Sequence, residues 1–63
     1  MISVESAGGS VKLKAVVSGK EYVAVGLRSD YPTVLGLLVI QMLKDGVSPD
    51  HICQAVKEAL QHL

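Results

Sequence analysis

The sequence contains no tryptophan or phenylalanine, only one cysteine and no long hydrophobic run. Its only aromatic residues are Tyr22 and Tyr31, yet 49% of the residues are hydrophobic, so the core must be largely aliphatic. One cysteine cannot form an intrachain disulfide, and no basic segment followed by a long apolar run opens the sequence, so we expect a cytoplasmic protein. The longest apolar run, Val34 to Ile40, is far shorter than the roughly 20 residues of a membrane span, and we expect no membrane partner.

Charge and length set further limits. Six basic and six acidic residues cancel, so the chain lacks the positive surplus typical of proteins that bind nucleic acids or anionic membranes. Its 63 residues predict one small domain, residues 1–63, near the lower limit for folding without disulfides or metal. Association with a second copy would be the simplest source of additional buried surface.

Residues 1–27 alternate between apolar and polar side chains with a period of two, which is typical of strands. Two glycine-containing breaks, Ala7–Ser10 and Ser18–Lys20, divide this region into three strands and predict an antiparallel meander. If the first break is a four-residue loop, Val4 lies opposite Leu13, and the apolar residues of both strands share one face.

The length of the second break decides which face of the third strand meets the core. A three-residue loop places Leu13 opposite Val25, whereas a two-residue loop would place Lys14 opposite Val23, so we predict the three-residue loop. The inner face would then carry Leu13, Ala15, Val23 and Val25. The outer face would carry Glu5, Lys12, Lys14, Val16, Tyr22, Ala24 and Gly26.

Two helices should follow the strands, giving an α+β fold of the order βββαα. The first is predicted from Tyr31 to Asp45, with Ser29 or Asp30 as its N-cap, Pro32 in the first turn and Gly46 at its C-terminal end. The second is predicted to begin after the N-cap residue Ser48, with Pro49 in its first turn and an apolar stripe along one side. This stripe comprises Ile52, Ala55, Val56, Ala59, Leu60 and Leu63.

The first helix is apolar on nearly every side, which is typical of a helix that is buried all round. The rest of the chain is too small to surround it, so we predict a homodimer in which a second copy covers part of it. The predicted dimer interface comprises Leu35, Leu38, Val39, Met42 and Leu43.

No residues have the spacing of a catalytic or metal site. His51 and Cys53 lie two positions apart, about 200° around a helix, so they do not form a nucleophile and base pair, and we expect Cys53 to be a buried or half-buried structural thiol. The spacing of His51, Cys53 and His62 matches no common zinc pattern. We therefore predict a protein that is not an enzyme and that uses no cofactor or metal.

The predicted outer face of the sheet is the best candidate for a partner-binding surface, because it combines an aromatic residue with concentrated positive charge. Its predicted binding residues are Lys12, Lys14, Val16, Tyr22 and Arg28. The leading hypothesis is a small homodimeric binding or regulatory protein that acts through protein–protein contact. The competing interpretation is that the lysines only solvate the face and discourage aggregation.

From Glu21 onward, the order of strand, helix, Gly46-Val47-Ser48 turn and amphipathic helix resembles a ribbon-helix-helix repressor. The resemblance covers about two-thirds of the chain. It implies a strand that pairs with its twin in a dimer and reads DNA bases through alternate side chains. The outward residues would be Tyr22, Ala24 and Gly26, which carry few hydrogen-bonding groups. A DNA-binding transcriptional regulator is therefore the alternative function.

Overall fold

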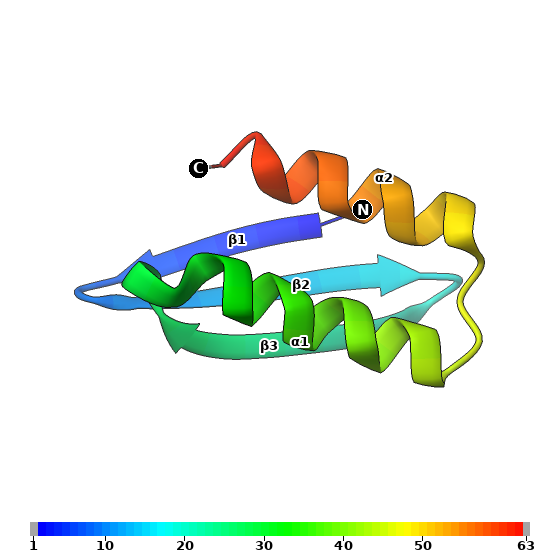
Figure 1. Ribbon diagram of the computed structural model, residues 1–63, viewed down its shortest axis with the longest axis horizontal. Coiled ribbons are helices and arrows are strands. Elements are labelled where there is room, and N and C mark those ends of the chain that lie inside the picture. Colours follow the sequence, from blue (N-terminus) through cyan, green and yellow to red (C-terminus); the bar gives the residue numbers. More distant parts are fainter. Residues whose placement is uncertain (1, 63) are drawn as a thin grey trace.

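Three antiparallel strands followed by two α-helices make up the computed structural model, which describes residues 2–62 (Figure 1). The strands β1 (Ile2–Ala7), β2 (Ser10–Val17) and β3 (Lys20–Leu27) pair in the order β1-β2-β3. This arrangement confirms the predicted α+β class and the three-stranded meander followed by two helices.

The helical part begins with a short 3-10 helix, η1 (Arg28–Asp30), which leads directly into α1 (Tyr31–Lys44). The second helix, α2 (Pro49–Leu60), follows a short turn. Both helices lie on the same side of the sheet, α1 mainly over β3 and β2, and α2 beside β1 (Figure 1). We call the face of the sheet that the helices cover the inner face, and the core lies between it and the helices. The largest fully buried side chains of the core are Val11, Leu13, Val34, Leu38 and Met42.

The first hairpin has the predicted register. Val4 lies opposite Leu13 and Ile2 opposite Ala15. The strands extend closer to the turn than expected, because Ala7 and Ser10 also pair and leave only two turn residues. Shortening the loop by one residue at each end leaves the register unchanged.

The predicted register of the second hairpin is wrong. The turn contains only Ser18 and Gly19, and both have positive φ angles, 52° and 80°. Positive φ at both central positions gives a two-residue turn whose twist matches that of the flanking strands. Lys14 therefore lies opposite Val23, the pairing that the sequence-based argument rejected. As a result, β3 turns its larger aliphatic residues outward and Tyr22, Ala24 and Gly26 inward, toward the helices.

Close packing between α1 and β3 explains this choice of face. A Cβ atom added at Gly26 would lie only 2.6 Å from Val34 Cγ2, so the absence of a side chain lets the helix approach the strand. Ala24 is 5% exposed and Leu38 is fully buried. The small residues of β3 thus leave room for the larger side chains of α1. Such complementary volumes give the close packing that is typical of protein interiors.

The observed helix boundaries agree closely with those predicted from the sequence. Gly46 has a φ of 79° beyond the end of α1, and the Ser48 side chain accepts a hydrogen bond from the backbone N–H of His51. The N-cap of α1 is Asp30, which makes no side-chain capping bond. In the stripe of α2, Ile52, Ala55 and Ala59 are buried, whereas Leu60 is exposed, contrary to expectation. Leu63 lies outside the described residues.

One side of α1 faces solvent in the single chain. Leu37, Ile40 and Leu43 are 48%, 49% and 58% exposed, so the chain alone does not cover the helix on all sides. No helix within residues 2–62 is long and apolar enough to cross a membrane.

Candidate binding surface

Both helices lie on one face of the sheet, and the opposite face has no described element over it. We call this opposite side the outer face; its main side chains are Glu5, Lys12, Lys14, Val16, Glu21, Val23, Val25 and Leu27. Val25 and Leu27 are 60% and 58% exposed, and Val16 and Val23 are exposed to a lesser degree. An apolar surface of this kind, bordered by charged residues, is typical of a contact surface.

The charges on the outer face come from neighbouring strands. Lys14 Nζ lies 3.0 Å from Glu21 Oε1, and both side chains remain substantially exposed. The pairing of β1 with β2 places Lys12 opposite Glu5. A hollow of about 250 Å³ near the β1–β2 turn is lined in part by Glu5, Lys12 and Val25, and most of its lining is apolar. The outer face thus offers apolar contact area with cations and anions at defined positions.

Three of the five predicted partner-binding residues, Lys12, Lys14 and Val16, lie on the outer face. Tyr22 does not, because the two-residue turn places it on the inner face, where it is 7% exposed. Arg28 lies beyond the end of β3, and its Nη1 donates a hydrogen bond of 2.5 Å to Ser6 Oγ. Val23 and Val25 were predicted on the inner face from the sequence, so the apolar part of this surface was missed.

Tyr22 instead belongs to a polar cluster that joins the β2–β3 turn to the end of α1. Its hydroxyl donates a hydrogen bond to Asp45 Oδ2, and Lys20 Nζ lies 2.6 Å from the same oxygen. The hydrogen bond from Lys20, followed by that from Tyr22, lowers the pKa of Asp45. The same contacts with Asp45 raise the pKa values of Lys20 and Tyr22. The cluster holds two elements together.

The predicted dimer-interface residues lie in different environments. Leu38 and Met42 are completely buried and Leu35 is 9% exposed, so these three side chains pack within the core of their own chain. Val39 is partly buried against that core. Only Leu43 is largely exposed. Of the predicted interface residues, only Leu43 and part of Val39 are therefore accessible to a second copy.

The residues with potential for chemistry are separated. Within residues 2–62, no three His, Cys, Asp or Glu side chains are grouped so that they could hold a metal ion. Cys53 is exposed, so the expected burial of this thiol is wrong. The His51 ring lies beside the Ser48 hydroxyl at 2.9 Å.

The remaining shifted pKa values have structural causes. A hydrogen bond from the backbone N–H of Ile2 lowers the pKa of Glu58, and burial raises the pKa of Tyr31. The Tyr31 hydroxyl donates to the backbone carbonyl of Ala59 at 2.7 Å, which joins α1 to α2. These groups therefore hold the fold together.

No known protein family, curated protein or solved structure matches this chain.

Proposed function

We propose that this protein is a homodimeric, non-enzymatic binding or regulatory protein that acts through protein–protein contact at the outer face of the sheet. The observation that carries the proposal is the uncovered sheet face, on which Val25 and Leu27 are more than half exposed. A sheet normally buries at least one apolar face, and here the inner face already meets the helices. The outer aliphatic residues are thus available to another molecule.

The chemistry of the face favours a protein partner with apolar residues and charges of both signs. Its aliphatic side chains offer contact area, and beside them Lys12 lies opposite Glu5 and Lys14 is paired with Glu21. Direct reading of DNA bases needs side-chain donors and acceptors at the groove edge. The outward residues of β3 between the turn and η1 are Glu21, Val23, Val25 and Leu27, and of these only Glu21 has a side-chain hydrogen-bonding group. Three apolar positions out of four do not favour the alternative, ribbon-helix-helix function.

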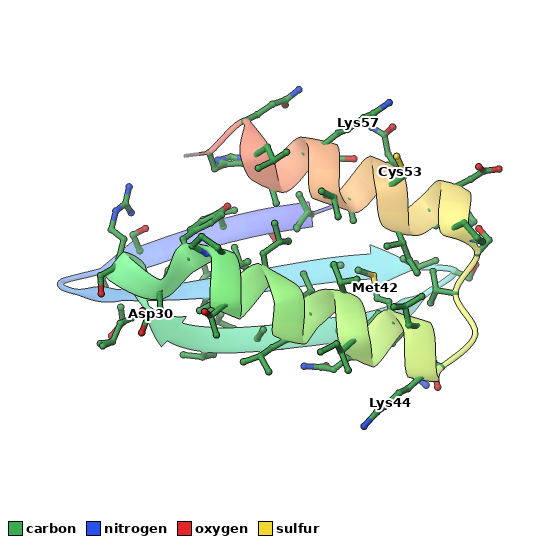
Figure 2. The ribbon with its side chains drawn as sticks, in the orientation of Figure 1. Asp30, Met42, Lys44, Cys53 and Lys57 are labelled. Atoms are coloured by element: carbon green, nitrogen blue, oxygen red, sulfur yellow. The ribbon has the colours of Figure 1, made fainter. Side chains whose placement is uncertain are left out.

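Two double variants of equal charge test which surface binds. Lys12→Glu with Val16→Glu alters the outer face, and Gln54→Glu with Lys57→Glu alters the exposed side of α2. Lys57 points away from the sheet (Figure 2). Proteins captured from an extract of the source cells by immobilised wild type, and confirmed as direct binders after purification, should lose affinity at least about tenfold with the first variant, as expected for hot-spot residues. Their affinity for the α2 variant should stay unchanged.

Three results would contradict the proposal: no direct protein binder, equal binding by the outer-face variant, or loss of binding only with the α2 variant. Circular dichroism and thermal unfolding of each variant establish that its fold is intact. Electrophoretic mobility of duplex and single-stranded DNA at several salt concentrations tests the alternative, because phosphate contacts produce a steep salt dependence. Salt-dependent retardation by the wild type, lost in the outer-face variant, would support nucleic-acid binding instead.

A further inference from the structure

The free edge of β3 exposes unpaired backbone groups. In an antiparallel pair, residues alternate between those bonded to the neighbouring strand and those whose N–H and C=O point away from it. The Arg28 N–H donates to the Gly9 carbonyl at 2.8 Å, which fixes this alternation for β3. Glu21, Val23, Val25 and Leu27 therefore direct their backbone groups away from β2. Gln41 Nε2 donates to the Val23 carbonyl at 2.8 Å, which independently shows that this carbonyl points outward.

The two edges of the sheet differ. On the β1 side, α2 packs beside the strand, and the Ile2 N–H donates to Glu58 Oε1 at 3.1 Å. On the β3 side, Gln41 is the only described residue with a side-chain hydrogen bond to an outward carbonyl. A long, flat strand edge without protection is a template for pairing with another strand. The β3 edge is the open one.

The side of α1 above this edge carries apolar and charged residues in a regular order. Leu37 and Lys44 are seven residues apart, about two helical turns, so they lie along one flank of α1. Asp30 is the N-cap residue that immediately precedes the helix. Gln41, four residues after Leu37, reaches the Val23 carbonyl and identifies this flank as the one beside the β3 edge. Asp30 and Lys44 lie at opposite ends of α1, both toward the β3 side of the molecule (Figure 2).

The strand edge and the helix flank share a common centre. Val34 packs on Gly26, and Gln41 reaches Val23. Seven helical residues rise about 10 Å, as do three strand residues, so positions on the two elements can be matched between these contacts. Ala24, the midpoint of the outward-bonding segment 21–27, then lies level with positions 38 and 39 of α1. The midpoint of Leu37 and Gln41 on the flank is position 39.

We propose that a second copy of this chain pairs antiparallel with the β3 edge, about a two-fold axis that passes between the two Ala24 residues and between the two copies of α1, level with the segment from Leu37 to Gln41. The two sheets then form one six-stranded sheet with both copies of α1 packed side by side on it. This proposal extends the homodimer part of the proposed function and uses a different surface from the outer face. A second copy of the chain fits this surface because a single two-fold axis both pairs the two β3 edges and packs the two α1 helices against each other.

The spacing between the layers is compatible with this axis. Neighbouring strands lie about 4.8 Å apart, so helices placed over β3 to β2 would be separated by about 5–14 Å across the axis, a range that includes the 8–10 Å of packed helices. The side of the molecule along β3 extends 32 Å by 19 Å. Its outline of roughly 600 Å² per copy is the upper limit of the area that this side can bury, and it matches the lower end of the roughly 600–1,000 Å² per partner found in stable interfaces.

Charge also favours the antiparallel arrangement. Lys44 of one copy faces the end of the flank that carries Asp30 of the other, within about one helical turn, which a lysine side chain can span. Neither residue has an ion-pair partner among residues 2–62. The two-fold axis forms this pair twice. A parallel arrangement of the helices would instead place like charges together.

The axis also fixes the strand register. Val23 of one copy lies opposite Val25 of the other in a bonded pair, with the two Ala24 residues facing each other at the centre. The Val23 carbonyl has two lone pairs, so it can accept the new backbone bond as well as that from Gln41. The inner faces of both strands remain under α1, and both outer faces stay open to solvent.

The first test compares two exposed leucines on the same helix. Leu37 lies on the flank beside β3, whereas Leu43, six residues later, lies about 240° around the helix and outside the proposed contact. Leu37→Glu should raise the dimer Kd on the order of 100-fold by placing carboxylates in the interface, and Leu43→Glu should leave it within about twofold. Sedimentation equilibrium measures both, with circular dichroism as a check on folding. A monomeric wild type at micromolar concentration would overturn the proposal, as would dissociation by Leu43→Glu alone.

The second test reports on register. In a Cys53→Ser background, Val23→Cys and Val25→Cys chains are prepared separately and mixed under mild oxidation. Opposed residues lie about 5.5 Å apart between Cα atoms, within the range of a disulfide, whereas diagonal neighbours lie about 7–8 Å apart. The mixture should therefore cross-link several times faster than either variant alone. Equal rates in all three samples would refute the register even if the protein is dimeric.

A charge exchange gives the third test. Lys44→Glu should raise the dimer Kd about tenfold, because it replaces two attractive pairs with two repulsive ones, and adding Asp30→Lys should restore it. Lys57→Glu on α2 is the matched control and should leave the dimer Kd unchanged. Failure of Asp30→Lys to rescue Lys44→Glu would refute the antiparallel helix contact. Because Lys12 and Val16 lie away from this edge, the outer-face variant should still dimerise, so the two proposals can fail separately.

Discussion

The Tyr22 hydroxyl donates a hydrogen bond to Asp45, which links the start of β3 to the residue that follows α1. Lys20 Nζ lies 5.6 Å from the centre of the Tyr22 ring and also contacts Asp45. These contacts require Tyr22 to lie on the same face of the sheet as the helices. They depend directly on the two-residue turn between β2 and β3.

Tyr22→Phe should destabilise the protein while keeping the fold. The ring would still fill its place on the inner face, but Asp45 would lose one donor, and Lys20 would remain its only side-chain partner among residues 2–62. Urea denaturation should give a lower midpoint with an unchanged m-value, because the surface exposed on unfolding stays the same. A midpoint equal to that of the wild type would mean that the hydroxyl contributes nothing to stability.

Acid should weaken the fold through Asp45 and Glu58. Both groups have a folded-state pKa below the ordinary value, so their stabilising contribution is complete above the unfolded-state pKa and is lost as pH falls through the folded-state pKa. The free energy of unfolding should therefore decline below about pH 4. Asp45→Asn should be less stable at pH 7 and should show a shallower decline in acid. Parallel profiles for the two proteins would contradict this linkage.

Gly26→Ala should destabilise the protein by about 1–3 kcal/mol, the usual cost of overpacking a well-filled interior. The new Cβ would lie too close to Val34 Cγ2, and the stiff valine side chain has little room to turn away. Chemical denaturation measures the loss. In a Val34→Ala background the same substitution should cost less, since the clashing methyl group is gone.

Gly36→Ala is the matched control and should have the opposite sign. A Cβ at this position meets no atom within 4 Å, and Gly36 lies inside α1. Alanine should stabilise the helix by about 0.5–1 kcal/mol, because glycine loses more conformational freedom on folding. Destabilisation by Gly36→Ala would indicate that another molecule packs closely against this side of α1.

Lysine substitutions should distinguish the buried side of α1 from its exposed side by their effect on stability. Leu38→Lys places an unpaired charge in a completely buried position, at a cost of several kcal/mol, and should unfold a domain of this size. Leu43→Lys at a 58% exposed position should change the free energy of unfolding by less than about 0.5 kcal/mol. Thermal unfolding followed by circular dichroism distinguishes these outcomes.

Local sequence rules predicted the elements but not the face of β3. Gly46, Ser48 and Pro49 marked the turn between the helices because each has a backbone or capping preference that holds in any context. In β3, by contrast, Val23 and Val25 alternate with Tyr22 and Ala24, so both faces are apolar enough to be buried. Steric fit with α1 decided between them, and that fit is a property of the packed structure. The Ser18-Gly19 pair was the available local signal, since glycine in a two-residue turn favours the tighter hairpin.

The candidate surface was predicted only in part for the same reason. Lys12, Lys14 and Val16 lie on the central strand, whose faces are fixed by the pairing with β1 that the sequence predicted correctly. Tyr22 was placed wrongly because its position depended on the second turn. The exposed flank of α1 was also missed, because a helix that is apolar all round gives no indication of which side the sheet will cover.

The hydrogen bond from Ile2 to Glu58 joins residues that are 56 positions apart, and this separation has a consequence for the order of folding. The two hairpins join neighbouring segments through two-residue turns, so they require little loop closure and can form early. The contact between β1 and α2 cannot form until the whole helical part has been synthesised. During translation, the β1 edge therefore remains open after the strands have emerged, and α2 is the last element able to close it.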